Sequence, residues 1–185
     1  KHKRERLETE GKIINEDSDE ENEDERTFRS ISIVSLPPLP PTLRELYCSG
    51  CTSLVSLPDP LPPTLEILNC SECTSLEFLP VLPATLEWLN CSGCINLQSL
   101  PDLPATLKNL FCNFCSSIES LPPLLPPGLK RLKCVECNFQ NIPALPHTLE
   151  ILNCTIAGQS LPELKNTSLT ELYMLKCPNL TCIPA

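Results

Sequence analysis

The stretch TLEILNCSECTSLEFLPVLP at residues 64–83 is followed, after one residue, by TLEWLNCSGCINLQSLPDLP at residues 85–104. Leucines, prolines and cysteines occupy the same positions in both stretches. The Leu-Pro pair of this unit, once Ile-Pro, recurs seven times from residue 36 onward, at intervals of 21, 22, 21, 21, 21 and 19 residues. A fixed period of this size indicates a solenoid, in which each unit packs on its neighbours. Such a chain favours a long binding surface over an enclosed catalytic pocket.

Each unit divides into a strand-like half and a proline-rich half. In the first half, Leu89 and Cys91 alternate with Trp88 and Asn90, and a period of two is typical of a short strand with one buried face. The second half carries the prolines, none of which precedes Pro37. Proline cannot donate a backbone hydrogen bond and favours an extended, polyproline-type path. The sequence therefore predicts one parallel β-sheet, an extended return and little helix.

The strand motif and the Leu-Pro-x-Leu-Pro-x-x-Leu opening resemble leucine-rich repeats, in particular the short repeats of bacterial secreted effectors of the IpaH and YopM type. The closing Cys-x-x-Leu-x-x-Leu-Pro, as at residues 51–58, also resembles repeats of plant intracellular immune receptors. The resemblance covers residues 36–185. It implies a leucine-rich-repeat solenoid of horseshoe shape, with the sheet on the concave face. No ligase or nucleotide-binding signature is present, so the activities of those families are not implied.

Composition divides the chain into three parts. Residues 1–26, which contain NEDSDEENEDE, are too polar to bury a core and are predicted to be a disordered acidic tail. Residues 27–35 are predicted to be a degenerate N-terminal cap. They resemble the end of a repeat in which acidic residues stand in place of the strand. Residues 36–185 form the repeat domain, with about seven repeats of 19–22 residues. An eighth unit begins at residues 182–185, so we expect the array to continue or to end uncapped, which would allow an end-to-end dimer.

Charge and apolar pattern exclude several classes of protein. The formal net charge is −9, whereas nucleic-acid binders are usually basic. No apolar run is long enough to span a membrane, and the charged opening KHKRER does not resemble a signal peptide. The two histidines, His2 and His147, belong to no nucleophile–base set, histidine cluster or phosphate loop. We therefore expect no enzyme activity in this segment.

Ten of the 13 cysteines form five C-x-x-C pairs at equivalent repeat positions. They could be zinc ligands, redox pairs or a buried cysteine ladder whose weak S–H donors hold turn carbonyls. The repeat register favours the ladder, because both members of a pair point inward and because Ala157 and Met174 replace a cysteine in later units. We expect no metal and no cofactor. The cysteines repeat in phase and their total is odd. Both facts fit a reducing intracellular compartment better than a secreted disulfide scaffold.

The outward residues of the predicted strands are the candidate binding site. Exposed aromatic and arginine side chains are typical of interface hot spots, and both tyrosines and the only tryptophan face outward. The predicted concave-face binding residues are Tyr47, Asn69, Trp88, Asn90, Phe111, Arg131, Lys133, Asn153 and Tyr173. Lys108, Lys130, Arg131 and Lys133 also form a basic cluster that could attract an acidic partner or the acidic tail.

These features predict a protein–protein interaction module that binds a partner protein on its concave sheet, in an effector-like role inside a host cell. Two alternatives remain at the level of the sequence. One is the substrate-recognition domain of a larger enzyme of the ubiquitin-ligase type. The other is the sensor segment of an intracellular immune receptor.

Overall fold

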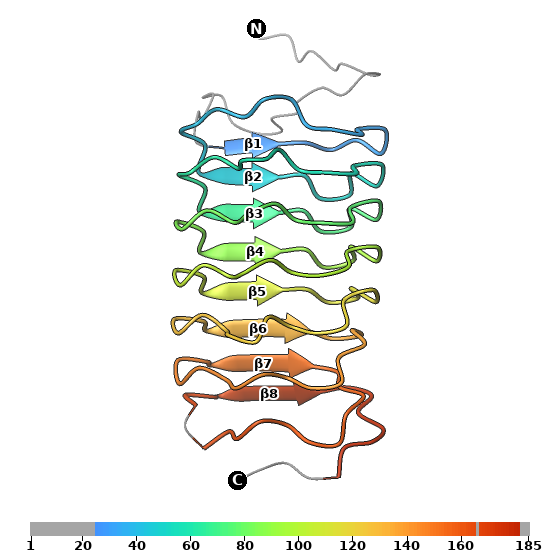
Figure 1. Cartoon of the computed structure of the whole chain (residues 1–185), viewed down its shortest axis with the longest axis vertical. Helices are drawn as coiled ribbons and strands as arrows, with labels where there is room; N and C mark the ends of the chain where they lie inside the picture. The colour runs from blue at the N-terminus through green and yellow to red at the C-terminus, as the bar shows by residue number, and fades with distance from the viewer. Residues whose placement is uncertain (1–24, 166, 182–185) are drawn as a thin grey trace, which may run out of the picture.

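A computed structural model describes residues 25–165 and 167–181 of the chain. Its regular elements are eight short parallel strands in one sheet, ordered β1 to β8 as in the sequence. Figure 1 shows the strands stacked one above another with one return loop between each pair. The bounds are β1 Glu25–Thr27, β2 Glu45–Tyr47, β3 Ile67–Asn69, β4 Trp88–Asn90, β5 Asn109–Phe111, β6 Arg131–Cys134, β7 Ile151–Cys154 and β8 Glu171–Met174.

The strands pair in one register along the whole sheet. Leu46, Leu68, Leu89, Leu110, Leu132, Leu152 and Leu172 are successive Cα partners. Because side chains alternate across a strand, this register puts every central leucine on one face and its flanking residues on the other. The predicted parallel strands of the seven repeats are thereby confirmed.

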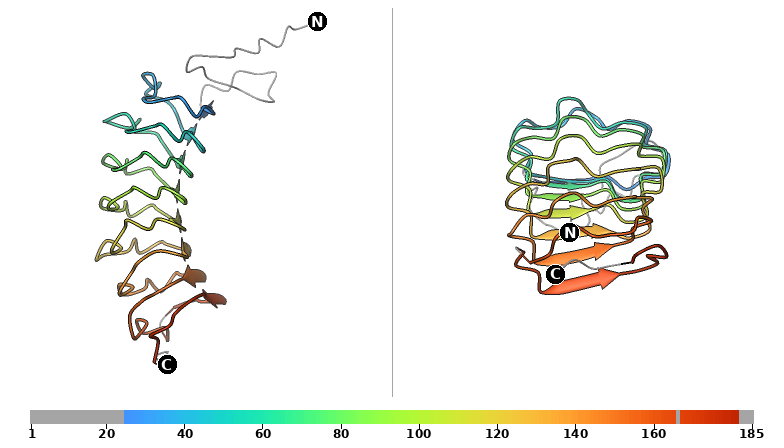
Figure 2. Two further views of the ribbon diagram at one scale, coloured as in Figure 1. Left: turned by 90° about the vertical axis from the view of Figure 1, so that its right-hand side faces the viewer. Right: turned by 60° about the horizontal axis from the view of Figure 1, so that its bottom comes forward.

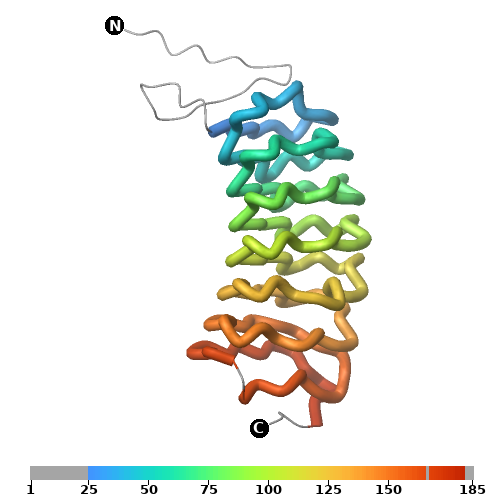
Figure 3. The backbone as a smooth tube through the Cα atoms, turned by 60° about the vertical axis from the view of Figure 1, so that its left-hand side comes forward, coloured from blue at the N-terminus to red at the C-terminus, as the bar shows by residue number. Residues whose placement is uncertain are grey.

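The core is a continuous column of leucine and cysteine layers between the sheet and the returns. In the unit of β4, Leu86, Leu89, Cys91, Cys94 and Leu97 are all fully buried. The tube in Figure 3 shows that the backbone of successive units follows nearly the same path. No charged or polar residue is buried within the described ranges. The interior is thus held by apolar contacts between neighbouring units rather than by ion pairs.

Each strand from β2 to β7 is introduced by a proline-containing turn. The Leu65 N–H donates to Pro62 O at 3.1 Å, and the Leu86 N–H donates to Pro83 O at 3.1 Å. The threonine inside this turn joins units together, since Thr85 Oγ1 lies 2.8 Å from both Pro63 O and Leu65 O of the preceding unit. These hydroxyls satisfy carbonyls that the proline-rich return cannot pair with a neighbouring strand.

A second repeated turn follows each strand from β2 to β6, inside the C-x-x-C segment. The residue before the second cysteine has a positive φ, as in Gly50 (75°), Gly93 (76°) and Phe114 (59°). Glycine enters this left-handed region at low cost, whereas Phe114 and Glu136 occupy it with a Cβ atom. The turn sends the chain away from the sheet and lets both cysteines point inward.

The sheet lines the concave side of a shallow curve, with the returns on the convex side (Figure 2). The returns contain turns and extended chain and no helix among the described residues. The predicted architecture, a solenoid with one parallel sheet on the concave face, is confirmed.

The first unit differs from its prediction. Glu25–Thr27 forms β1 and pairs with β2, so the boundary predicted at residue 26 lies inside a strand. Phe28 and Ile33 are buried, and the Phe28 N–H donates to Tyr47 O at 2.6 Å. Glutamate and arginine can form this strand because its pairing uses only backbone groups and its outward face stays near solvent. Residues 25–36 therefore build a unit that keeps its strand, and residues 1–24 lie outside the described range.

The last described unit is packed less tightly than the units before it. Leu152 and Cys154 of β7 are fully buried, whereas their partners Leu172 and Met174 of β8 are only partly buried. A residue of the solenoid interior is covered from both sides by neighbouring units, and β8 has a described neighbour on one side only. The eighth unit predicted from residues 182–185 lies outside the described residues.

Candidate functional site on the concave sheet

The register aligns the outward residues in columns that run along the sheet. The first column reads Glu25, Glu45, Ile67, Trp88, Asn109, Arg131, Ile151 and Glu171. The second reads Thr27, Tyr47, Asn69, Asn90, Phe111, Lys133, Asn153 and Tyr173. All nine residues predicted to bind a partner therefore lie on one face. Glu25 and Thr27 also lie on this face but were not predicted, because no Leu-x-Cys motif marks β1.

Four side chains from three neighbouring strands form what we call the central cluster: Trp88, Phe111, Arg131 and Lys133. The rings of Trp88 and Phe111 meet edge to face, with centroids 5.5 Å apart and planes at 76°. The Lys133 ammonium lies 5.3 Å from the centroid of the Phe111 ring. Edge-to-face packing and a cation over a ring are both favourable, by about 0.5–1.5 kcal/mol each. These contacts hold an apolar surface and a cation side by side.

Arg131 is the most exposed member of the central cluster, and its Nη1 donates to Asn109 Oδ1 at 3.2 Å. Its guanidinium retains further N–H donors, in a planar fork that suits a carboxylate. Neither Arg131 nor Lys133 forms an ion pair within the part of the chain that the structure describes. The two charges remain available to a partner.

The other two members of the predicted basic cluster, Lys108 and Lys130, form ion pairs with glutamates of neighbouring units. Lys108 Nζ lies 2.7 Å from Glu87 Oε2, and Lys130 Nζ lies 3.1 Å from Glu150 Oε1. Arg44 pairs with Glu66 in the same way at the N-terminal end of the sheet. These pairs connect neighbouring units just before each strand. The sequence predicted a cluster of four cations. In the fold, ion pairs neutralise two of them, so Arg131 and Lys133 are the members of this cluster that carry an unpaired positive charge among the described residues.

The N-terminal end of the sheet face is acidic. Tyr47 Oη donates to Glu45 Oε2 at 2.9 Å, and Glu25 lies beside Glu45 in the register. Burial first, and then the hydrogen bond and the charge of Glu45, raise the pKa of Tyr47 to about 12. Tyr47 therefore stays a neutral phenol that presents its ring to a partner while its hydroxyl is engaged with Glu45.

The three asparagines of the second column differ in their hydrogen bonds. Asn69 Oδ1 accepts the Ser71 N–H at 3.1 Å, and Asn90 Oδ1 accepts the Ser92 N–H at 3.0 Å. These bonds hold the start of the turn after the strand. The equivalent N–H at Thr155 donates to Cys134 O instead, at 3.4 Å. Asn153 Oδ1 is consequently covered without a hydrogen-bond partner among the described residues.

This difference predicts opposite effects of the same substitution at two equivalent positions. Asn90→Leu removes an acceptor that a backbone N–H uses, and it should lower the free energy of unfolding by about 1–2 kcal/mol. Asn153→Leu removes an acceptor that has no partner, and it should leave stability unchanged or raise it by up to about 1 kcal/mol. Urea unfolding followed by circular dichroism measures both. Equal losses at the two positions would contradict the assignment of Asn90 as a turn-forming residue.

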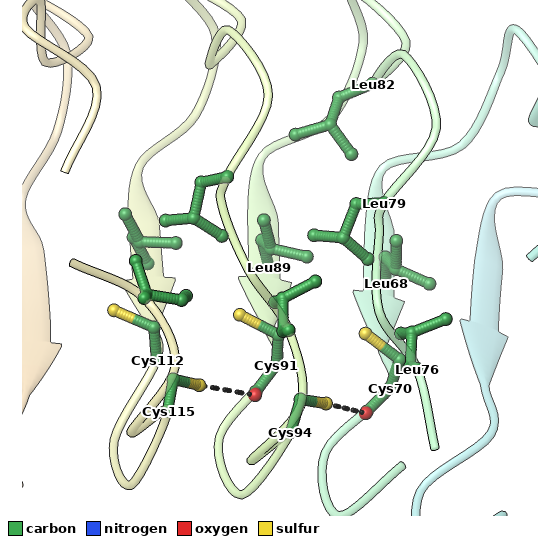
Figure 4. Close-up of a cluster of buried hydrophobic side chains, with 14 of the residues drawn as sticks. Leu68, Cys70, Leu76, Leu79, Leu82, Leu89, Cys91, Cys94, Cys112 and Cys115 are labelled. Atoms are coloured by element: carbon green, nitrogen blue, oxygen red, sulfur yellow. Dashed lines mark hydrogen bonds between the residues drawn. The ribbon is translucent and has the colours of Figure 1, made fainter. Parts of the chain in front are cut away.

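The C-x-x-C pairs form a repeated hydrogen-bond pattern inside the solenoid. In four successive units, the second cysteine donates its S–H to the carbonyl of the first cysteine one unit earlier. Cys73 Sγ lies 3.1 Å from Cys48 O, Cys94 Sγ lies 3.1 Å from Cys70 O, and Cys115 Sγ lies 3.1 Å from Cys91 O. Figure 4 shows two of these contacts among the buried leucines. Cys48 O and Cys91 O also accept the N–H groups of Cys51 and Cys94, at 3.3 and 3.2 Å, so the thiol is a second donor there. For Cys70 O, the S–H of Cys94 is the only donor among the described residues, and it pairs a carbonyl in an apolar interior.

Burial and mutual contact keep most of these thiols protonated. The hydrogen bond with the second cysteine of the next unit, and then burial, raise the pKa of Cys70 and Cys91 well above its usual value. Burial raises the pKa of Cys154 to about 12. The thiolate is the form that ligates zinc and attacks disulfides, so these positions are poorly suited to either chemistry.

Cys73 and Cys137 are shifted in the other direction. The hydrogen bonds with Cys48 and Cys112, respectively, lower their pKa. Both side chains are nonetheless buried, at 0% and 3% exposure. In the described part of the chain, no three histidine, cysteine, aspartate or glutamate side chains are grouped so that they could hold a metal ion. The geometry of the pairs is that of packing and hydrogen bonding.

Comparison with known proteins was made at the level of sequence and of structure. No protein-family model matches the chain, and no curated protein matches it by sequence. Solved structures do match, among them YopM from Yersinia enterocolitica WA-314. That match has 29% sequence identity and a TM-score of 0.56, and it covers 82% of this chain. The chain is a leucine-rich-repeat protein. Its repeats are related to those of YopM, of which it spans 39% of the length.

Membership in the leucine-rich repeats agrees with the shape of the site. Leucine-rich-repeat solenoids are typically binding scaffolds that present an extended concave surface to another protein. Searching the described residues for a helix long and apolar enough to cross a membrane finds none.

Proposed function

We propose that this leucine-rich-repeat protein binds a partner protein on its concave sheet, with the central cluster as the anchor. The observation that carries the proposal is the contact of Trp88, Phe111 and Lys133 in the middle of a sheet face that none of the described return loops covers. Tryptophan, tyrosine and arginine are the side chains that most often dominate binding energy when they lie near the centre of an interface.

Around this anchor, the remaining candidate residues have distinct roles in the proposal. Tyr47 and Tyr173 contact the partner towards the two ends of the sheet. Asn69, Asn90 and Asn153 contribute amide groups from the second column, and Asn69 and Asn90 also form their turns. The periphery of an interface usually contributes complementarity rather than energy, so we expect smaller effects at these positions.

We further propose an effector-like role inside a host cell, in a reducing compartment. The similarity to YopM supports this setting. The buried cysteines support it independently, because an S–H that donates to a backbone carbonyl loses this bond when the sulfur is oxidised. A recognition domain of a larger enzyme would use the same sheet face, and the identity of the partner distinguishes the two.

The proposal is tested by capturing proteins from host-cell lysate with the parent chain and with Trp88→Ala/Phe111→Ala/Arg131→Ala, followed by mass spectrometry. A matched control, Phe78→Ala/Val81→Ala/Lys165→Ala, removes two apolar side chains and a cation outside the strands. Binding to the identified partner should weaken at least about 30-fold in the first variant, which corresponds to loss of about 2 kcal/mol. The control should bind as the parent does. Equal affinity of the parent and the first variant would place the binding surface elsewhere.

A further inference from the structure

The concave face carries its charges in a definite order along the sheet. β1 and β2 present Glu25 and Glu45, β6 presents Arg131 and Lys133, and β8 presents Glu171. Between the acidic and basic parts lie the apolar side chains of β3 to β5, namely Ile67, Trp88 and Phe111. The face therefore reads acidic, apolar, basic and acidic from the N-terminal end.

The fold makes this order stronger than it is in the sequence. Lys108 and Lys130 lie just before β5 and β6 and would spread the positive charge further, but they are neutralised by Glu87 and Glu150. Lys133 is held over the Phe111 ring and Arg131 is steadied by Asn109, so both cations have defined positions on β6. A localised charge selects a partner more sharply than a diffuse one, because like charges placed opposite each other are costly.

The dimensions of the face fit one helix lying across the strands. Strands of three or four residues are about 10–13 Å long at about 3.3 Å per residue, close to the 10–12 Å diameter of a helix with its side chains. Parallel strands are about 4.8 Å apart, so β2 and β6 are about 19 Å apart. A helix rises about 1.5 Å per residue, so about 13 residues cover that distance.

We propose that the concave sheet accepts an amphipathic helix of a partner protein whose charge order is the complement of its own. An acidic residue of this helix faces Arg131 and Lys133, and apolar residues fill the surface over Trp88 and Phe111. A basic residue about 11 or 14 positions from the acidic one faces Glu45, because at about 3.6 residues per turn these are the spacings near 13 that stay on one face of the helix. The order also sets the direction of the helix along the solenoid. This inference rests on the proposed function and specifies the chemistry of the partner at the same site.

The test is a selection from a displayed library of random 20-residue peptides on the intact chain. Enriched peptides should carry aspartate or glutamate at one end, apolar residues at a spacing of three and four, and lysine or arginine about 11 or 14 positions away. Selection on Arg131→Glu/Lys133→Glu should replace the enriched acidic residues by basic ones. Lys165→Glu/Lys176→Glu makes the same change of net charge outside the strands and should leave the selected order unchanged.

The outcomes separate this inference from the proposed function. Binders that lose affinity at least tenfold on Trp88→Ala/Phe111→Ala but show no charge order would overturn the inference alone. A spacing of about six residues between the charges would also overturn it, because that spacing fits an extended segment at about 3.3 Å per residue. A library that yields no binder sensitive to Trp88→Ala/Phe111→Ala would count against both.

Discussion

Replacing Leu89 with alanine should lower the free energy of unfolding by about 3 kcal/mol, within the range of about 2–5 kcal/mol seen for buried leucines. Leu89 is fully buried, and its Cα partners Leu68 and Leu110 cover it from both neighbouring units. The cavity cannot close, because the strand spacing on each side is held by backbone hydrogen bonds. Urea unfolding followed by circular dichroism measures the loss.

The matched control is Leu172→Ala in β8. Leu172 is the same residue at the same repeat position, but it is only partly buried and has a described neighbour, Leu152, on one side. Its loss should cost about 1 kcal/mol, because less apolar area returns to water and the end unit can relax. A cost at Leu172 equal to that at Leu89 would show that the last described unit is covered as well as the middle ones.

The second large effect is expected in the cysteine pattern. Cys94→Ala should lower the free energy of unfolding by about 2–3 kcal/mol, because it removes buried volume and leaves Cys70 O without its S–H donor. Cys70→Ala removes the same volume from a side chain that is equally buried. In the described chain the Cys70 thiol donates no such bond, so this variant should cost about 1 kcal/mol less.

The comparison of the two cysteine variants isolates the hydrogen bond from the packing. A third variant, Cys94→Val, restores apolar volume without a donor and should recover only part of the loss, because Cys70 O stays unpaired. If Cys94→Val equals the parent in urea unfolding, the S–H contributes nothing and the second cysteine is there for its size alone.

In the repeat units, most of the fold could be predicted from the sequence alone. The period, the alternation of Leu89 and Cys91 with Trp88 and Asn90, and the position of prolines were enough to place seven strands, the inward leucines and the outward columns. Side chains alternate with a period of two along a strand, and every unit contains the same strand pattern. The local pattern of one unit therefore predicts the fold of the whole array. The YopM-like repeat was visible for the same reason.

The first unit shows where this reasoning stops. Glu25–Thr27 has none of the apolar pattern of the other strands, yet it pairs with β2 through backbone groups that any residue carries. Strand formation at the edge of an existing sheet depends on the template beside it, which a local reading of residues 25–27 does not contain.

By itself, the sequence determined the solenoid, the strand positions of its seven repeats and which face their side chains take, because these follow from periodicity within each unit. Only the tertiary structure decided which of those side chains are engaged by neighbouring units and which remain available to a partner. Stacking the units pairs Lys108 with Glu87 and lays Lys133 over Phe111. It also directs the Thr155 N–H to Cys134 O, which leaves Asn153 Oδ1 without a partner among the described residues, and it turns the second cysteine of each C-x-x-C pair towards a carbonyl of the preceding unit. Such contacts join residues about 20 positions apart, and their distances and competing partners are set when one unit is placed on another.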